Sequence, residues 1–113
     1  MKGVNNIDLT ECGKKQILEY LMGVHTINLY NCNQITDNGL KYLTGVHTIN
    51  LRGCNKIDKG MEYLKRVHTI NLLACSKITD LGLKYLKGVH KITLKSCRKI
   101  KDLGIQKEFI QLI

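Results

Sequence analysis

The chain of 113 residues contains no proline, no tryptophan and a single phenylalanine, and it has no long apolar run. A transmembrane helix needs about 20 consecutive apolar residues, and a secretory signal needs an apolar stretch of about 7 to 15. Because neither is present, we expect a soluble cytoplasmic protein without a membrane partner. Asparagine, isoleucine and lysine are abundant instead, a composition that AT-rich genes tend to encode.

Several catalytic and cofactor-binding motifs are also missing. The sequence has no glycine-rich phosphate loop, no G-x-S-x-G elbow, no C-x-x-C pair and no clustered pair of carboxylates. These absences exclude the commonest sequence signatures of nucleotide, hydrolase, zinc and redox sites. Single glycines recur instead, which favours close packing over phosphate binding: Gly39, Gly60, Gly82 and Gly104. We therefore expect no enzyme, no cofactor and no catalytic or metal-binding residues.

One short segment recurs along the chain. GVHTINL occupies 23–29 and 45–51, RVHTINL 66–72, GVHKITL 88–94 and the related GVNNIDL 3–9. A period of 20 to 22 residues is in the range of leucine-rich repeats, in which each copy buries its apolar side by stacking on its neighbours. We expect one domain over 1–113, with repeats at approximately 3–22, 23–44, 45–65, 66–87 and 88–113.

Each copy reads V-x-x-I-x-L-x-x-C, and its alternating branched residues predict a short strand. The residues expected to point inward are Ile27 and Leu29, Ile49 and Leu51, Ile70 and Leu72, and Ile92 and Leu94. Because every connection has the same length and returns in the same direction, consecutive strands must run parallel. The predicted fold is an α/β leucine-rich repeat solenoid, with a curved parallel sheet on the concave side and short helices on the convex side.

A helical signal follows each turn, and it is clearest in ITDNGLKYL at 35–43 and ITDLGLKYL at 78–86. Thr36 and Thr79 are the expected N-caps of these helices. The third copy, KIDKGMEYL, lacks the threonine. We expect Asp58 to cap a shortened turn there.

The pattern L-x-x-C-x-x-I-T-D-x-G-L-x-x-L resembles the cysteine-containing subclass of leucine-rich repeats. The matching segments are LYNCNQITDNGLKYL at 29–43, LRGCNKIDKGMEYL at 51–64, LLACSKITDLGLKYL at 72–86 and the weaker LKSCRKIKDLGI at 94–105. The near-identical copies are also similar to repeat proteins of large DNA viruses that infect amoebae. The resemblance implies the substrate-recruiting part of F-box proteins in ubiquitin ligases. An F-box would stand ahead of the repeats, and only three residues precede Val4. We therefore expect this chain to bind a partner but not to recruit a ligase through an F-box of its own.

Cysteine and histidine each hold one fixed place in the repeat. The cysteines are Cys12, Cys32, Cys54, Cys75 and Cys97, and the histidines are His25, His47, His68 and His90. We expect the cysteines to be free thiols in a buried ladder, because they behave as small apolar side chains. The histidine rings should lie about 5 Å apart, the spacing of parallel strands. That spacing leaves open a metal site, a pH-sensitive row, or copied residues without a role.

The outward strand positions form three columns on the concave face, and there we place the candidate site. The first two columns are uniform through the middle repeats, and Asn28, Asn50 and Asn71 could form a ladder of amide hydrogen bonds. The third column changes at every step, which is how a repeated scaffold builds a recognition surface. The predicted partner-binding residues are Tyr30, Arg52, Leu73, Lys95, Asn28, Asn50, Asn71 and Lys91.

Formal net charge is +9, and residues 45–113 carry fourteen basic and five acidic side chains against four and four in 1–44. A basic half can meet an acidic protein or nucleic acid. We expect an acidic protein partner, with nucleic acid as the alternative, because few aromatic side chains are available for base stacking. A purely structural repeat fragment is a third reading. The first strand has no evident cap. Its exposed edge could therefore pair with a second copy of the chain, and self-association is a further possibility.

Overall fold

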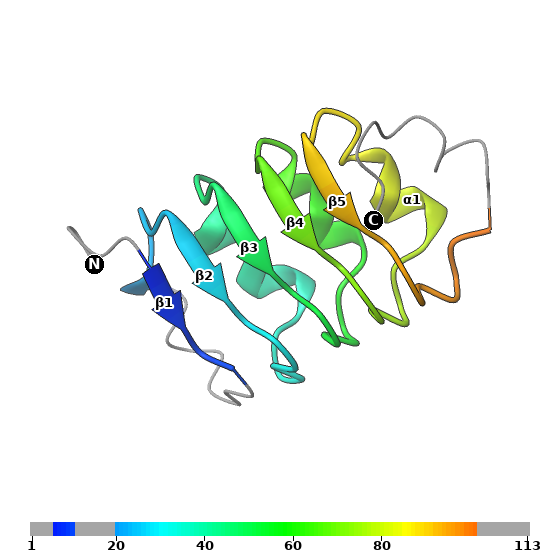
Figure 1. Ribbon diagram of the computed structural model, residues 1–113, viewed down its shortest axis with the longest axis horizontal. Helices are drawn as coiled ribbons and strands as arrows, with labels where there is room; N and C mark the ends of the chain where they lie inside the picture. Colours follow the sequence, from blue (N-terminus) through cyan, green and yellow to red (C-terminus); the bar gives the residue numbers. More distant parts are fainter. Residues whose placement is uncertain (1–5, 11–19, 102–113) are drawn as a thin grey trace.

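The computed structural model describes residues 6–10 and 20–101, and its core is a single parallel sheet (Figure 1). Five strands follow one another in the order β1-β2-β3-β4-β5. Their bounds are Asn6–Asp8, Thr26–Asn28, Thr48–Asn50, Thr69–Asn71 and Lys91–Thr93. Every neighbouring pair is parallel, and the register brings equivalent residues of successive repeats side by side, for example Ile27 beside Ile49.

Short helices cover the opposite side of the sheet from the exposed strand face. They are η2 (Asp37–Leu43), η3 (Lys59–Leu64) and α1 (Asp80–Lys84). Figure 1 shows them stacked behind the strands as a second layer. The predicted α/β solenoid of the leucine-rich repeat type is confirmed, because an all-parallel sheet alternates with short helices. Among the described residues, η2 and η3 are 3-10 helices and α1 is an α-helix.

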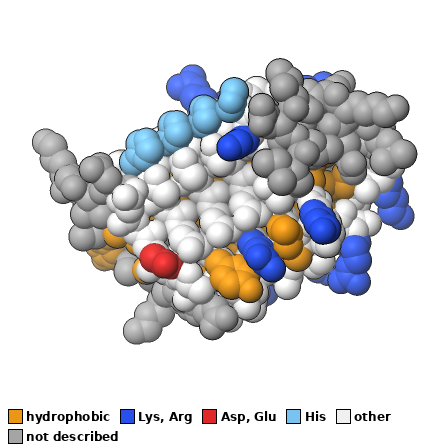
Figure 2. All heavy atoms as spheres, in the orientation of Figure 1, with side chains coloured by type: hydrophobic (Ala, Val, Ile, Leu, Met, Phe, Trp, Pro, Cys, Tyr) orange, Lys and Arg blue, Asp and Glu red, His pale blue; other side chains and the backbone are white. Residues whose placement is uncertain are grey.

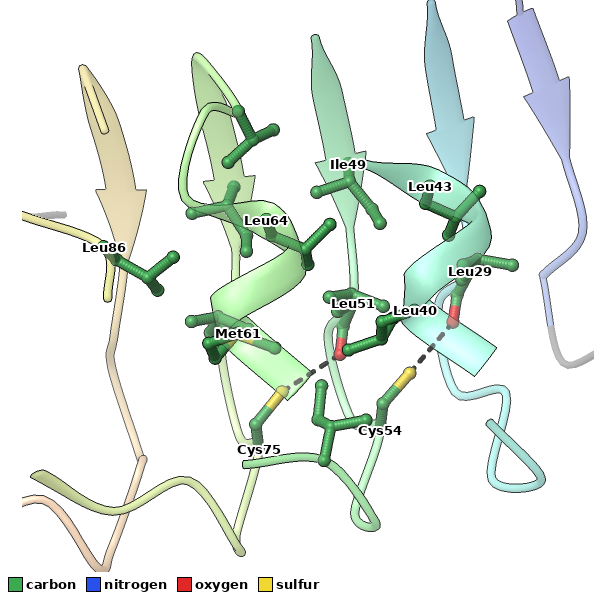
Figure 3. Packing of buried hydrophobic residues seen from close by; sticks show 14 of the residues in the cluster. Leu29, Leu40, Leu43, Ile49, Leu51, Cys54, Met61, Leu64, Cys75 and Leu86 are labelled. Carbon is green, nitrogen blue, oxygen red and sulfur yellow. Dashed lines mark hydrogen bonds between the residues drawn. The ribbon is translucent and has the colours of Figure 1, made fainter. Parts of the chain in front are cut away.

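The hydrophobic core lies between these two layers (Figure 3). The inward strand residues predicted from the alternation are all buried, with at most 6% of their surface exposed. Leu40, Leu43, Met61 and Leu64 meet them from the helices and are 2% exposed or less. Because each side chain packs against equivalent residues of the repeats before and after it, the core is continuous along the stack.

The cysteines form the predicted buried ladder, as far as the described residues reach. Cys32, Cys54, Cys75 and Cys97 are buried free thiols, whereas Cys12 lies outside the described residues. Each Sγ–H donates to a leucine carbonyl oxygen of the preceding repeat, for example Cys54 to Leu29 at 3.2 Å and Cys75 to Leu51 at 3.0 Å (Figure 3). The thiols thereby satisfy carbonyl groups at the ends of the strands.

The residue before each of these cysteines has a left-handed backbone. The positive φ angles belong to Asn31, Gly53, Ala74 and Ser96, at 61°, 77°, 61° and 67°. This conformation is costly for residues that carry a Cβ, and alanine and serine gain little there in return. The chain turns sharply off the sheet at this position in every described repeat, so the turn geometry overrides local preference.

Aspartates link the turns of successive repeats, which corrects the predicted helix caps. Thr36 and Thr79 do occupy the N-cap positions with extended backbones, but neither side chain makes a capping bond. Asp58 also stands at an N-cap position without capping its own helix. Its carboxylate instead accepts the backbone N–H and the hydroxyl of Thr79, at 2.9 and 3.0 Å. The capping prediction considered one repeat alone and therefore missed these bonds between repeats.

Asp37 and Asp80 make the same kind of bond between repeats on either side of Asp58, and we call these three residues the aspartate ladder. Asp37 accepts the N–H of Asp58 at 2.7 Å, and Asp80 accepts the N–H of Lys101 at 3.0 Å. The recurring glycines make room for it, because a Cβ on Gly60 would lie 2.8 Å from the Cα of Asp37. A Cβ on Gly82 would lie 2.6 Å from the carbonyl oxygen of Asp58. Close packing thus accounts for these two glycines, as predicted.

Within the part of the chain that the structure describes, no helix has the length and apolar character needed to cross a bilayer.

Candidate functional site: the sheet face

The outward strand positions and the histidines that precede them form one continuous surface, which we call the sheet face. It is the side predicted to be concave. Figure 2 shows the histidines as a row along one edge, uncharged atoms across the middle, and alternating hydrophobic and basic side chains along the opposite edge. The uncharged band consists of the threonine and asparagine columns of β2, β3 and β4.

The varied third column lies just beyond the ends of the strands. Tyr30 and Leu73 are half-buried, whereas Arg52 and Lys95 are exposed. The guanidinium of Arg52 lies over the ring of Tyr30, 5.3 Å from its centroid. Such a cation–π contact fixes both side chains and leaves the guanidinium edge free to meet a carboxylate. The structure therefore brings two of the predicted binding residues into direct contact.

The asparagine column differs from the predicted amide ladder. The side-chain oxygens of Asn28, Asn50 and Asn71 accept the backbone N–H two residues further on, at 3.0, 2.9 and 2.9 Å. These local turns start the departure of the chain from the sheet. Within the described residues, the asparagine side chains make these bonds and none to the next asparagine. The prediction of a ladder was wrong because the backbone N–H of the same turn needs the oxygen.

The amide orientation that results has a consequence for binding. With its oxygen held by the turn, each asparagine presents its NH2 group as a donor on the sheet face. Asp8 holds the equivalent place in β1 and accepts the N–H and the hydroxyl of Thr10, at 3.0 and 2.6 Å. These two bonds lower the pKa of Asp8. The middle of the face is thus a neutral band of hydrogen-bond donors, with one carboxylate at its start.

The histidine rings are stacked along the edge of the face. The centroids of neighbouring rings are 4.5 Å apart from His25 to His47, from His47 to His68 and from His68 to His90. The first two pairs are within 12° of parallel. The predicted spacing of about 5 Å is confirmed, because parallel strands carry equivalent side chains at nearly their own separation.

Threonine hydroxyls hold three of these rings. In His25, His47 and His68, Nδ1 lies 2.8 Å from the Oγ1 of the following threonine. His90 is followed by Lys91 instead. The role of the threonine column as a support for the rings was not foreseen, although the repeated His-Thr pair in the sequence was its signal.

The surroundings of the histidine row change the pKa of His68. Loss of hydration beside the stacked rings, and then the positive charges of His47, His90 and Lys91, lower the pKa of His68. Among residues 6–10 and 20–101, no cluster of three or more histidine, cysteine, aspartate or glutamate side chains is arranged to hold a metal ion.

The cysteines lie in the core rather than on this face. Burial raises the pKa of the Cys54 thiol to about 12, and it also raises the pKa values of Cys75 and Cys97. A neutral, buried thiol is a poor nucleophile and a poor metal ligand. These three side chains therefore act as packing groups.

A hollow at the ends of the helices was not predicted. It is an open hollow of about 670 Å³ where the ends of η3 and α1 meet the loop before β3. Tyr63 and Tyr85 line it together with Glu62, Lys65 and Arg66. Its signal in the sequence was a tyrosine that recurs directly before a leucine at the end of each helical segment, as in Tyr63-Leu64 and Tyr85-Leu86.

The predicted site residues thus separate into three groups. Tyr30 and Arg52 are in contact, Leu73 and Lys95 continue their column, and the asparagines lie beside them in the neutral band. Lys91 belongs to the first outward column, near the histidine edge.

A scan against protein-family models and a search of curated proteins both find no match for this chain.

Proposed function

We propose that the chain is a non-enzymatic module that binds an acidic protein partner on its sheet face. The observation that carries the proposal is the Tyr30–Arg52 contact in the column that changes at every repeat. Tyrosine and arginine are the residue types most often found at binding hot spots. Because the two side chains already hold each other, less conformational entropy is lost when a partner docks.

The rest of the surface fits the same kind of partner. Leu73 offers an apolar contact beside this pair, while Lys95 and Lys91 add positive charge at the later repeats. The NH2 groups of the asparagine column can donate to backbone or side-chain oxygens. We also propose that the repeats belong to the cysteine-containing leucine-rich repeat class, and that the partner is a protein recruited for ubiquitination by a ligase that this chain assists.

Nucleic acid is the second candidate, because the excess of positive charge in the later repeats would attract any polyanion. Its weakness is the position of the aromatic side chains. Tyr63 and Tyr85 line the hollow at the helix ends, and the ring of Tyr30 on the sheet face lies against Arg52. Binding to single-stranded DNA and RNA at low and high salt, with a steep loss at high salt, would favour this candidate.

The experiment that tests the proposal compares the proteins that co-purify with tagged variants from a eukaryotic host. The first variant combines Tyr30→Ala, Arg52→Ala, Leu73→Ala and Lys95→Ala. Its control removes the same four residue types outside the sheet face: Tyr85→Ala, Arg66→Ala, Leu81→Ala and Lys84→Ala. Both variants must retain the cooperative unfolding of the wild type.

The proposal expects acidic proteins that co-purify with the wild type and the control but not with the sheet-face variant. Each recovered protein is then purified and its affinity for the three chains is measured directly. Equal recovery by all three chains, or recovery by none of them, contradicts binding through the third column.

A further inference from the structure

The row of stacked histidines has no role in the function proposed above, and all four side chains are exposed. Four rings follow one another at 4.5 Å along the edge of the sheet face. Their contacts, within the described part of the chain, are with one another and with threonine hydroxyls. Since Nδ1 is occupied in three of the rings, Nε2 is the nitrogen that remains for a partner.

The threonine contact can persist through a change of protonation. A hydroxyl donates to Nδ1 of a neutral ring and accepts from Nδ1–H of a charged one. Protonation of His47 or His68 therefore requires only a rotation of the hydroxyl of Thr48 or Thr69. Histidine is the side chain whose ordinary pKa lies between pH 5 and 8, so the row can gain charge in this range without losing its support.

The charges around the row oppose that gain. Those acting on His68 are His47 just before β3, His90 just before β5 and Lys91 at the start of β5, and all are positive when protonated. On the adjoining helix ends and loops stand Lys65, Arg66 and Lys87, with Glu62 as the acidic residue in the hollow. Asp8, the carboxylate of the sheet face, belongs to the asparagine column and is already bonded to Thr10. None of the charged groups that act on His68 is acidic.

We propose that the histidine row is a proton-dependent docking strip for a carboxylate-rich segment of a protein partner. This inference rests on the proposed function, since it assigns pH regulation to the same sheet face. A supported ring whose Nδ1 accepts from threonine already carries its proton on Nε2. In the pH range where histidine ordinarily titrates, an added proton goes to Nδ1, so the strip keeps its Nε2–H donors and gains positive charge. Carboxylates placed against it offset the repulsion between the rings, so binding draws protons onto the row.

A protein segment suits this strip better than a nucleic acid does. The row is flanked by neutral threonine and asparagine side chains, which offer hydrogen bonds to peptide groups but no aromatic surface for bases. Basic residues lie on the opposite edge of the same face, where Arg52 and Lys95 are exposed. An acidic partner can therefore contact both edges, and the histidine edge strengthens as pH falls.

The test measures how tightly a rhodamine-labelled peptide of alternating aspartate and glycine binds at pH 7.5 and pH 5.5, at one ionic strength. Aspartate stays ionised at both values, so a change in affinity reports on the protein. The expected result is binding about fivefold tighter at pH 5.5, which is what a rise of about one unit in the pKa of one ring on binding gives between these two pH values. Calorimetry near pH 6.5 in two buffers of different ionisation enthalpy should show net proton uptake.

Two matched variants assign the effect. His47→Gln with His68→Gln removes the two central rings, and it should abolish both the pH-dependent gain and the proton uptake. Lys41→Gln with Lys84→Gln removes two exposed charges from the helix side, and it should leave both unchanged. Unfolding curves at both pH values establish that all chains are folded in the assay.

Several results would overturn the inference. Wild-type affinity that does not change with pH, an unchanged gain in the double histidine variant, or no peptide binding at all would each do so. A labelled oligo-dT that shows the same histidine-dependent gain with higher affinity would assign the strip to nucleic acid. The proposed function has its own readout in this assay, which is peptide binding at pH 7.5. Loss of that binding on changing Arg52 and Lys95 to alanine supports the proposed function, and unchanged binding contradicts it. The pH-dependent gain tests the histidine row separately.

Discussion

The carboxylate of Asp58 accepts two hydrogen bonds from Thr79 of the next repeat, one from its backbone N–H and one from its hydroxyl, at 2.9 and 3.0 Å. Asp58 also packs against Gly82, because a Cβ on Gly82 would meet both the carboxylate and the backbone carbonyl oxygen of Asp58. This one side chain therefore connects two turns that are 21 residues apart in the sequence. Asp37 and Asp80 repeat the connection on either side.

Asp58→Ala should lower the free energy of unfolding by about 2 kcal/mol, the range for a hydrogen bond to a charged group. Asp58→Asn should lower it by roughly half as much, because an amide oxygen can still accept one bond. Chemical denaturation of each variant measures the difference. Glu62→Ala, which removes an exposed carboxylate from η3, should change stability by less than about 0.5 kcal/mol. Equal effects of Asp58→Ala and Glu62→Ala would exclude a structural role for the aspartate ladder.

Ala74→Gly should stabilise the protein, because Ala74 has a φ of 61°. A left-handed residue with a Cβ costs about 1 kcal/mol or more, and the greater freedom of glycine in the unfolded chain offsets part of the gain. We expect a net increase of about 0.5 kcal/mol in denaturation experiments.

Gly53→Ala is the reciprocal change at the equivalent position of the preceding repeat. Gly53 has a φ of 77°, and an added Cβ would lie 2.8 Å from the side-chain oxygen of Asn31. It should therefore destabilise the protein by more than about 1 kcal/mol. If both changes were to shift stability in the same direction, the turn would not have the conformation described.

The buried cysteines should resist alkylation in the native state. The pKa of Cys54 is raised to about 12 by burial, and Cys75 is fully buried with its pKa raised as well. Thiolate is the reactive form, so native labelling by iodoacetamide at pH 8 should be on the order of a thousandfold slower than in denaturant. Mass spectrometry of the peptides that contain Cys54 and Cys75 separates these sites from other thiols. Similar native and denatured rates would show that the ladder is open to solvent.

Stability should fall as the solution is acidified through pH 6.5. The folded protein lowers the pKa of His68, so below the ordinary pKa of histidine the unfolded chain binds more protons at this residue. The contribution is therefore fully present above about pH 6.5 and is lost as pH falls toward the folded-state pKa. Guanidinium midpoints at pH 7.5 and pH 5.5 measure the change.

His68→Gln provides the comparison for this pH effect. The variant should show a smaller drop between the two pH values, because one shifted titration has been removed. A drop of the same size or larger would place the effect on other groups. The measurement uses the free protein, so it is independent of any partner.

Much of the fold could be predicted because the repeated segments can be aligned with one another within this single sequence. The period-two alternation identified the buried pairs such as Ile49 and Leu51, and equal spacing required parallel strands. The same reasoning placed the histidines one strand apart, and the rings stack at 4.5 Å. These features depend on the pattern within one copy and on translation to the next.

The features that escaped prediction are choices of side-chain partner, either in the next copy or within the same turn. Asp58 serves the next turn rather than its own helix, and Asn50 bonds to its own turn rather than to the next rung. The contact of Arg52 with Tyr30 joins residues of two repeats at one side-chain position. A single sequence shows which residues recur, but the choice among their hydrogen-bond partners is made by the distance and tilt between strands.

The central claim is that the sheet face contacts a protein partner, and photo-crosslinking tests it most directly. p-Benzoylphenylalanine replaces Tyr30 on the sheet face in one chain and Tyr85 on the helix side in another, and both are irradiated in a eukaryotic host. We predict a discrete crosslinked product with an acidic protein from position 30 and none from position 85. Products of the same kind from both positions, from position 85 alone, or from neither would contradict recognition through the sheet face.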